Sequence, residues 1–247
     1  MTERRIPIFI AGATGFCGQG VVEALCQHST FRVIAHIRPG SSRLASATKR
    51  FEAWGADVLC CEFSELSEEL AALQPKVFAS FIGTTKAQMR EHGGSYQSID
   101  YQLNYELLEI AKKGTNEPLF FYLSSMGAQW GKWNAYLKAR LMIERELENS
   151  SLSYVVMRPG ILSGASRDQE RLGEEVGAWF SHKMAGFYEK IGLQARADGT
   201  KPLDAPDVGR FVRGVLEKQL LEHKESSQER TQKIYELPEI HRMLREG

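Results

Sequence analysis

A serine pair, a tyrosine and an arginine are spaced so that they could carry out proton transfer. Ser124 and Ser125 follow an apolar run, Tyr136 begins the helical segment that comes next, and Arg140 lies four residues later. Side chains four residues apart share one face of a helix, so the charge of Arg140 would favour the phenolate and lower the pKa of Tyr136. A serine hydroxyl and this phenol could then converge on one substrate oxygen and move its proton.

Each of these residues also has a purely structural interpretation. Ser124 or Ser125 could cap a turn, and Tyr136 could be a half-buried helix residue. Arg140 could pair with Glu144, which lies one helical turn further on. We name Ser125, Tyr136 and Arg140 as the candidate catalytic residues.

Three glycines near the start of the chain could hold a phosphate group. An apolar, strand-like run leads into Gly12, Gly15 and Gly18, and a helical pattern follows. At such a junction, backbone N–H groups and the positive end of a helix dipole bind anions. We expect Gly12 to make the tight turn, Gly15 to admit a pyrophosphate and Gly18 to let the helix pack closely. Thr14 and Phe16 complete this part of the predicted cofactor site, and the alternative is a tight turn without a ligand.

The end of the second predicted strand favours one form of the cofactor. In dinucleotide-binding folds this position contacts the adenosine ribose, through an acidic residue for NAD or a basic one for NADP. Here the sequence has no carboxylate and offers Arg38 and Arg43, whose guanidinium groups suit a phosphate. NADP(H) is therefore favoured over NAD(H). The alternative is that both arginines only solvate a loop.

A second small-residue turn follows the fourth predicted strand. Gly83 and Thr84 lie there, at the carboxyl edge where a parallel sheet keeps its ligand crevice. A glycine at this place would admit the backbone of a cofactor. We therefore add Gly83 and Thr84 to the cofactor-binding residues.

Apolar strand-like runs alternate with helical stretches, which predicts an α/β fold with a doubly wound parallel sheet. Because the strands are apolar throughout, both faces of the sheet should be covered by helices. We expect strands over 6–11, 31–37, 57–61, 77–82, 119–124 and 153–158, and a short one over 233–237. We expect helices over 16–27, 43–54, 65–73, 97–113, 135–148 and 206–221.

Length and composition limit the remaining possibilities. A chain of 247 residues suits one NAD(P)-binding domain over 1–247, in which 160–204 breaks the strand and helix rhythm and is a candidate substrate lid. Lys and Arg total 31, as do Asp and Glu, so we expect a small-molecule substrate as partner, with no nucleic acid and no membrane. The four cysteines have no metal-ligand spacing, and no signal peptide or membrane span is visible, so we expect a cytoplasmic protein without a metal site. A homo-oligomer is compatible with the sequence, which carries no specific signal for one.

The motifs together resemble a known family. The glycine turn 12–18, Gly83-Thr84-Thr85-Lys86, Ser124-Ser125, Tyr136 and Arg158-Pro159-Gly160 look like those of an atypical or extended short-chain dehydrogenase/reductase. Within that superfamily the chain is most similar to the Tat-interacting-protein type of NADP-binding oxidoreductase. The resemblance covers about residues 6–165. It implies a Rossmann-like sheet, bound NADP(H), a Ser and Tyr active site and a substrate pocket made by the C-terminal part.

One position departs from this family. The family's tyrosine is followed four residues later by a lysine that holds the nicotinamide ribose and joins a proton relay, and this chain has Arg140 there. An arginine keeps the charge but cannot give up a proton. Lys138 lies only two residues from Tyr136 and faces away from it on a helix.

Three functions are therefore compared. The first is an NADP(H)-dependent oxidoreductase that acts on a small carbonyl or alcohol. The second is an NADP-binding regulatory or assembly protein with little turnover, which the arginine would allow. The third is a sugar-nucleotide epimerase or dehydratase, for which the stretch after Gly160 is short and the usual Tyr-x-x-x-Lys is altered.

Overall fold

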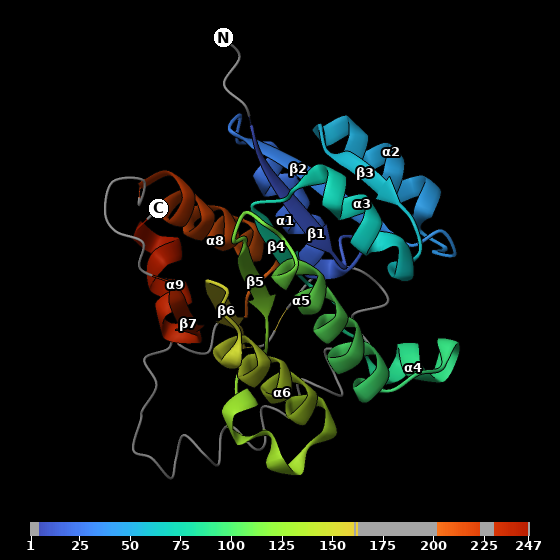
Figure 1. Cartoon of the computed structure of the whole chain (residues 1–247). Helices are drawn as coiled ribbons and strands as arrows, with labels where there is room; N and C mark the ends of the chain where they lie inside the picture. The colour runs from blue at the N-terminus through green and yellow to red at the C-terminus, as the bar shows by residue number, and fades with distance from the viewer. Residues whose placement is uncertain (1–4, 161, 163–201, 223–229, 247) are drawn as a thin grey trace.

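A parallel β-sheet with helices on both faces organises the described part of the chain (Figure 1). The computed structural model describes residues 5–160, 162, 202–222 and 230–246. Within them the strand order is β3-β2-β1-β4-β5-β6-β7, and every neighbouring pair is parallel. The strands are β1 Ile6–Ala11, β2 Phe31–Ile37, β3 Asp57–Cys60, β4 Val77–Ser80, β5 Leu119–Leu123, β6 Tyr154–Arg158 and β7 Gln232–Glu236. This is the doubly wound, Rossmann-like arrangement, and the strand order reverses between β1 and β4.

Helices of several lengths connect the strands. The α-helices are α1 Phe16–Cys26, α2 Leu44–Trp54, α3 Leu66–Leu73, α4 Lys86–His92, α5 Asn104–Lys112, α6 Ala135–Asn149, α8 Ala205–Glu217 and α9 Leu237–Glu246. Short 3-10 helices are η1 Phe63–Glu65 and η3 Ala128–Trp133. Wider π-helical turns form η2 Tyr96–Leu103 and η5 Lys218–Glu222.

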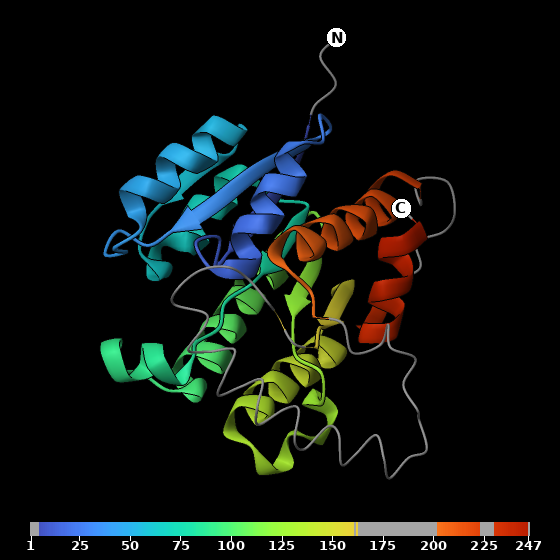
Figure 2. The ribbon, with the colours of Figure 1, turned by 180° about the vertical axis from the view of Figure 1, so that it is seen from behind.

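Alternate residues of each strand enter opposite hydrophobic cores. Ile8 and Ile10 pack on the side that carries α1, α2, α8 and α9, which Figure 2 brings forward. Phe9 and Ala11 pack on the other side, against α3, α5 and α6. The prediction that helices cover both faces of the sheet is therefore confirmed, and it explains why the strands are apolar throughout.

The predicted strands all occur, with ends that differ by at most two residues. The single helix expected over 97–113 is instead the π-helical η2 followed by α5. Among the described residues, α4, η3 and α9 are helical segments that were not predicted. The candidate lid over 160–204 lies almost wholly outside the described residues.

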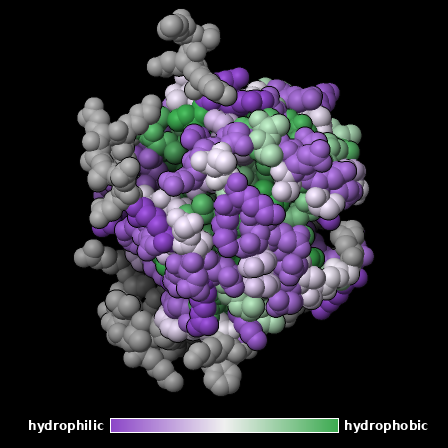
Figure 3. Space-filling view, in the orientation of Figure 1, coloured by the Kyte–Doolittle hydropathy of each residue, from purple (hydrophilic) through white to green (hydrophobic). Residues whose placement is uncertain are grey.

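The face of the molecule seen in Figure 3 is mainly hydrophilic, with separate hydrophobic areas between the polar ones. This is expected for α5 and α6, whose apolar residues Leu107, Leu108, Ile143 and Leu147 are buried beneath them. Among the helices of the described residues, none combines the length and the apolar character that a membrane crossing requires.

A pair of glycines allows α1 and α8 to cross in close contact. A Cβ on Gly209 would lie 2.2 Å from the carbonyl oxygen of Gly20, and a Cβ on Gly20 would lie 2.2 Å from that of Ala205. Real Cβ atoms do not approach a backbone so closely, so any side chain at these positions would push the helices apart. The crossing helps to place the start of α1, which follows the glycine turn directly.

This crossing gives a stability prediction. Gly209→Ala should lower the free energy of unfolding by about 1–3 kcal/mol, because the methyl group overpacks the contact with Gly20. Gly214→Ala is the matched control on the same helix, since a Cβ there meets nothing within 4 Å. The control should gain about 0.5–1 kcal/mol from its higher helix propensity. Urea unfolding of both variants measures the difference, and equal stability of the two would contradict this account of the crossing.

Candidate active site

The glycine turn at the carboxyl end of β1 has the geometry of a close backbone turn. Gly12 has a φ of +74°, and a Cβ there would lie 2.6 Å from the carbonyl carbon of Phe81. A Cβ on Gly18 would lie 2.2 Å from the carbonyl oxygen of Gly12, so the start of α1 packs directly on the turn. Gly15 precedes α1, and a Cβ on it would approach only the Gly12 oxygen, at 3.2 Å. Gly12 and Gly18 thus have structural reasons to be glycine, whereas a Cβ on Gly15 would meet no other atom of the described residues within 4 Å.

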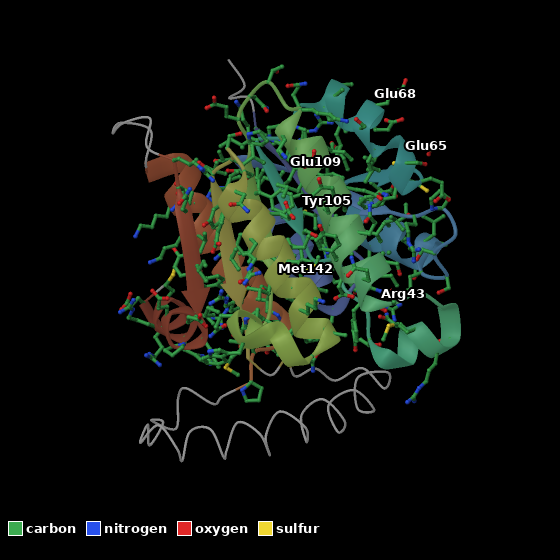
Figure 4. All side chains as sticks on the ribbon, turned by 60° about the horizontal axis from the view of Figure 1, so that its bottom comes forward. Arg43, Glu65, Glu68, Tyr105, Glu109 and Met142 are labelled. Carbon is green, nitrogen blue, oxygen red and sulfur yellow. The ribbon has the colours of Figure 1, made fainter. Side chains whose placement is uncertain are left out.

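Side chains from α1 and α2 support this turn. The carbonyl oxygen of Thr14 accepts hydrogen bonds from Gln19 Nε2 at 2.8 Å and from Arg43 Nη1 at 3.2 Å. Arg43 directly precedes α2, and Figure 4 labels it in a view with the lower end of Figure 1 brought forward. Arg38 is exposed and forms no hydrogen bond or ion pair with other described residues through its side chain. Phe16 is half-buried and packs against the core on the α1 side of the sheet.

His36, near the end of β2, is a buried residue that the sequence analysis did not assign. Its Nε2 is 3.0 Å from the carbonyl oxygen of Cys61. Burial lowers the pKa of His36 below its ordinary value of 6.5, and the charge of Arg38 acts in the same direction. Both effects favour the neutral imidazole, whereas the nearby Arg38 and Arg43 carry a permanent charge.

Tyr136 lies at the N-terminus of α6, where Asn134 caps the helix. The Asn134 side chain accepts hydrogen bonds from the backbone N–H groups of Tyr136 at 2.9 Å and Leu137 at 3.2 Å. The half-buried ring of Tyr136 packs on Tyr96, with ring centroids 5.4 Å apart. The guanidinium carbon of Arg140 lies 5.1 Å from the centroid of the Tyr136 ring. The charge thus contacts the face of the ring, and the Tyr136 hydroxyl forms no hydrogen bond with the described residues.

Arg140 is almost completely buried and points toward the sheet. Its Nη2 donates to Oδ1 of Asp100 at 2.8 Å, and Asp100 has no exposed surface. Its Nη1 donates to the carbonyl oxygens of Leu123 at 2.8 Å and Ile82 at 3.2 Å, and to the Tyr122 hydroxyl at 3.3 Å. Arg140 therefore joins the ends of β4 and β5 to α6 and η2.

Gly83 belongs to this cluster as well as to the predicted cofactor turn. A Cβ on Gly83 would lie 2.3 Å from Nη2 of Arg140, so the missing side chain makes room for the guanidinium group. The backbone N–H of Thr84 donates to Oδ2 of Asp100 at 3.0 Å. Burial raises the pKa of the Asp100 carboxyl, while Arg140 and the Thr84 N–H oppose that rise.

A second buried network contains Ser124. Its hydroxyl donates to Oε1 of Glu144 at 2.5 Å, and Glu144 forms an ion pair with Arg158 at 2.6 Å. Arg158 also pairs with Glu236 on β7 at 2.6 Å. The suggested pairing of Arg140 with Glu144 is thus wrong, because each of these residues has another buried partner.

The two candidate serines therefore differ. Ser124 is committed to Glu144, whereas the hydroxyl of Ser125 makes one long contact of 3.4 Å, to the carbonyl oxygen of Met126. Within the part of the chain that the structure describes, no hydrogen bond joins Ser125 to Tyr136. Their action on one substrate oxygen stays a prediction.

Three residues of this region were missed from the sequence. Tyr96, Asp100 and Asn104 all lie on η2 or at the start of α5, and Asn104 Nδ2 donates to the carbonyl oxygen of Asp100 at 2.9 Å. A signal was present, because positions 100, 104, 107, 108 and 111 form one buried helical stripe. Polar residues at the first two positions of such a stripe indicate a buried polar contact.

Comparisons with known proteins agree with this fold. The family model described as NAD(P)H-binding matches residues 12–183. In a search of curated protein sequences, none matches the chain. Among solved structures, the 3-oxoacyl-[acyl-carrier protein] reductase from Brucella melitensis has a TM-score of 0.61 and 14% identity, and the match covers 94% of this chain and 90% of that one.

Two other solved structures are similar. A variant of actinorhodin polyketide ketoreductase with NADPH has a TM-score of 0.60 and 13% identity, with 87% of this chain and 91% of that chain covered. A "putative NAD-dependent epimerase/dehydratase" from Bacillus halodurans has a TM-score of 0.53 and 23% identity, with 65% and 73% covered. At these identities the likeness shows a shared fold. Of these three proteins, the ketoreductase is described with NADPH and the epimerase/dehydratase as NAD-dependent.

The bonds of Arg140 give a prediction for the substitution that would introduce the lysine of the related family. Arg140→Lys should lower the free energy of unfolding by about 1–3 kcal/mol, because one ammonium group cannot reach Asp100, Leu123 and Ile82 together and leaves buried groups unpaired. Lys138→Arg is the control on the exposed side of α6 and should stay within about 0.5 kcal/mol of the wild type. Chemical unfolding followed by circular dichroism decides the matter, and full stability of Arg140→Lys would refute the structural role of the guanidinium group.

Proposed function

This chain belongs to the NAD(P)H-binding family, and from that premise we propose that it is an NADP(H)-dependent oxidoreductase of the short-chain dehydrogenase/reductase type. Its substrate would be a small carbonyl or alcohol. The observation that carries the proposal is the placement of Tyr136 at the N-terminus of α6 while Ser124 is occupied by Glu144. Ser125 is then the serine whose hydroxyl is available to a substrate.

The residues around the glycine turn fit a dinucleotide. The turn lies beside the point where the strand order reverses, a Cβ on Gly15 would approach only the Gly12 oxygen among the described residues, and α1 begins there with its positive dipole end. Gly12, Thr14, Gly15, Phe16 and Gly18 would hold the pyrophosphate, and Gly83 and Thr84 would contact the cofactor from the end of β4. When bound, the nicotinamide would exchange a hydride with the substrate carbon.

The protein's own groups would handle the proton. The Tyr136 phenol would donate a proton to the substrate oxygen in reduction and accept it in oxidation. The Ser125 hydroxyl would hydrogen-bond the same oxygen and orient it. Arg140 would act through the ring of Tyr136, because its guanidinium group contacts the ring face rather than the hydroxyl. In this proposal Arg140 positions the tyrosine and transfers no proton itself.

The preference for NADP(H) rests on Arg38 and Arg43. Both lie between β2 and α2, where the 2′-phosphate would be placed. Arg38 is exposed and its side chain makes no hydrogen bond or ion pair among the described residues, and Arg43 already reaches the Thr14 carbonyl of the glycine turn. The lowered pKa of His36 favours its neutral form beside these arginines.

A second candidate function has a specific observation in its favour. The position that holds a lysine in the resembling family is occupied by Arg140, whose guanidinium group is used in four contacts within the fold. A protein of this kind could bind NADP(H) and turn over little substrate. It would then act as a regulatory or assembly protein that responds to the cofactor.

The cofactor preference can be measured directly. Arg38→Ala should weaken NADPH binding about tenfold or more, because a charge-assisted pair with the 2′-phosphate contributes about 1.5–3 kcal/mol. NADH binding should change little. Arg242→Ala, which removes an exposed arginine on α9, is the control and should leave both affinities unchanged. Titration by cofactor fluorescence gives the affinities of the wild type and both variants for each cofactor, and equal binding of NADPH and NADH by the wild type would end this part of the proposal.

The proposed chemistry depends on one hydroxyl. Tyr136→Phe should abolish NADPH oxidation with aldehyde, ketone and quinone substrates and leave NADPH affinity nearly intact, because the phenol acts on the reacting oxygen. Tyr105→Phe removes the hydroxyl of another partly buried tyrosine, on α5, and should retain wild-type turnover. Turnover that survives in Tyr136→Phe would sink the mechanism, and a wild type that binds NADPH without turnover would favour the second function.

A further inference from the structure

Asp100 connects the Gly83-Thr84 turn of the proposed cofactor site with Arg140, on which the Tyr136 ring packs. We propose that Asp100 is a positioning residue, whose one carboxylate holds both the Gly83-Thr84 turn and, through Arg140, the ring of Tyr136. The proposal rests on the proposed function, because that function makes the turn part of the cofactor site and Tyr136 the proton-transfer residue. It adds a requirement that cofactor binding and tyrosine placement depend on the same buried charge.

The geometry divides the carboxylate between two donors. Oδ2 accepts from the Thr84 backbone N–H at 3.0 Å, and Oδ1 accepts from Arg140 Nη2 at 2.8 Å. Asp100 is completely buried, so water cannot replace either donor. Thr84 precedes α4 on the cofactor side, and Arg140 lies one turn into α6 from Tyr136.

Arg140 transmits this constraint to Tyr136. The guanidinium group is fixed by Asp100 on one side and by the carbonyl oxygens of Leu123 and Ile82 on the other. The Tyr136 ring rests on it at 5.1 Å, and Tyr96, on the same π-helical segment as Asp100, packs on the ring from η2. Tyr136 is therefore enclosed by a cation and an aromatic ring that both depend on the position of η2.

The π-helical form of η2 is consistent with such a role. Its wider turns bring Tyr96, Asp100 and Asn104 to the sheet edge, where Asn104 also accepts a hydrogen bond from Ser80 at the end of β4. Turns of this kind are unusual and are often found at functional sites. The contact of Gly83 with Arg140 adds a second connection, since the turn cannot move toward α6 without meeting the guanidinium group.

Substituting Asp100→Asn tests the proposal, because an amide has one acceptor oxygen where the carboxylate serves two donors. We expect NADPH binding to weaken about tenfold, a tenfold change being 1.4 kcal/mol, although Asp100 is separated from the cofactor by the turn. Leu70→Ala is the control, because it removes a buried side chain of α3 and lowers stability without touching the network. Affinities are measured by NADPH fluorescence at a temperature where both variants are folded. Wild-type affinity in Leu70→Ala and a loss confined to Asp100→Asn support positioning.

Amide hydrogen exchange supplies a readout that needs no cofactor. In the wild type the Thr84 amide should exchange slowly, because it donates to the buried Asp100 carboxylate. This protection depends on the Asp100 side chain, since Thr84 lies outside the helices and strands. In Asp100→Asn, exchange at Thr84 and around Tyr136 should rise about tenfold or more at unchanged pH, and Leu70→Ala should show neither increase. Asp100→Glu keeps the charge and should restore part of the protection.

The outcomes separate this proposal from the proposed function. If the wild type binds no NADP(H), the proposed function fails, and the exchange measurement still decides whether Asp100 holds the turn and the tyrosine. An unprotected Thr84 amide in the wild type would overturn the positioning role even if Asp100→Asn does not fold. Equal NADPH affinity in Asp100→Asn and Leu70→Ala would also overturn it, because Asp100 would then serve stability alone.

Discussion

The buried ion pair between Arg140 and Asp100 is the interaction on which the rest of this region depends. A charge without a partner inside a protein is very costly, so each of these residues requires the other and enough hydrogen bonds to replace water. These requirements explain several local features together. Gly83 lacks a side chain where the guanidinium group lies, the Ile82 and Leu123 carbonyls turn toward it, and η2 adopts wide turns that place Asp100 beneath the turn.

A second buried network works beside the first. Glu144 collects Ser124 and Arg158, and Arg158 extends the network to Glu236 on the edge strand β7. Both networks contain a residue of α6, Arg140 or Glu144, and both reach the carboxyl end of β5. Together they hydrogen-bond many of the polar groups buried there. Among the described residues, the hydroxyls of Ser125 and Tyr136 belong to neither network. The site is thus defined as much by the polar groups that are committed elsewhere as by those that are presented.

The sequence predicted features that depend on local pattern. The strands are apolar runs bounded by polar or glycine residues, and Gly12, Gly15 and Gly18 form a turn whose geometry depends on neighbouring residues, so both could be read directly. The partner of the Arg140 side chain could not be predicted in this way. Asp100 is 40 residues away in the sequence, and helical spacing suggested Glu144 instead. The π-helical turns of η2 were missed because helical spacing alone predicts one continuous helix over 97–113. The predicted lid falls outside the described residues.

The replacement of lysine by arginine affects the two halves of the site differently. Among the described residues, the glycine turn and the arginines after β2 form no hydrogen bond with Arg140, whereas Gly83, at the end of β4, packs directly against its guanidinium group. The half that contains Tyr136 is built around the guanidinium group, which is permanently charged and donates through Nη1 and Nη2 to groups inside the fold. A lysine can release a proton and swing toward a ribose, whereas this arginine is restrained by several carbonyl and carboxylate oxygens. In the proposed function, the glycine turn would bind the cofactor with an arginine at position 140, and the proton would pass through Tyr136 without a relay at that position.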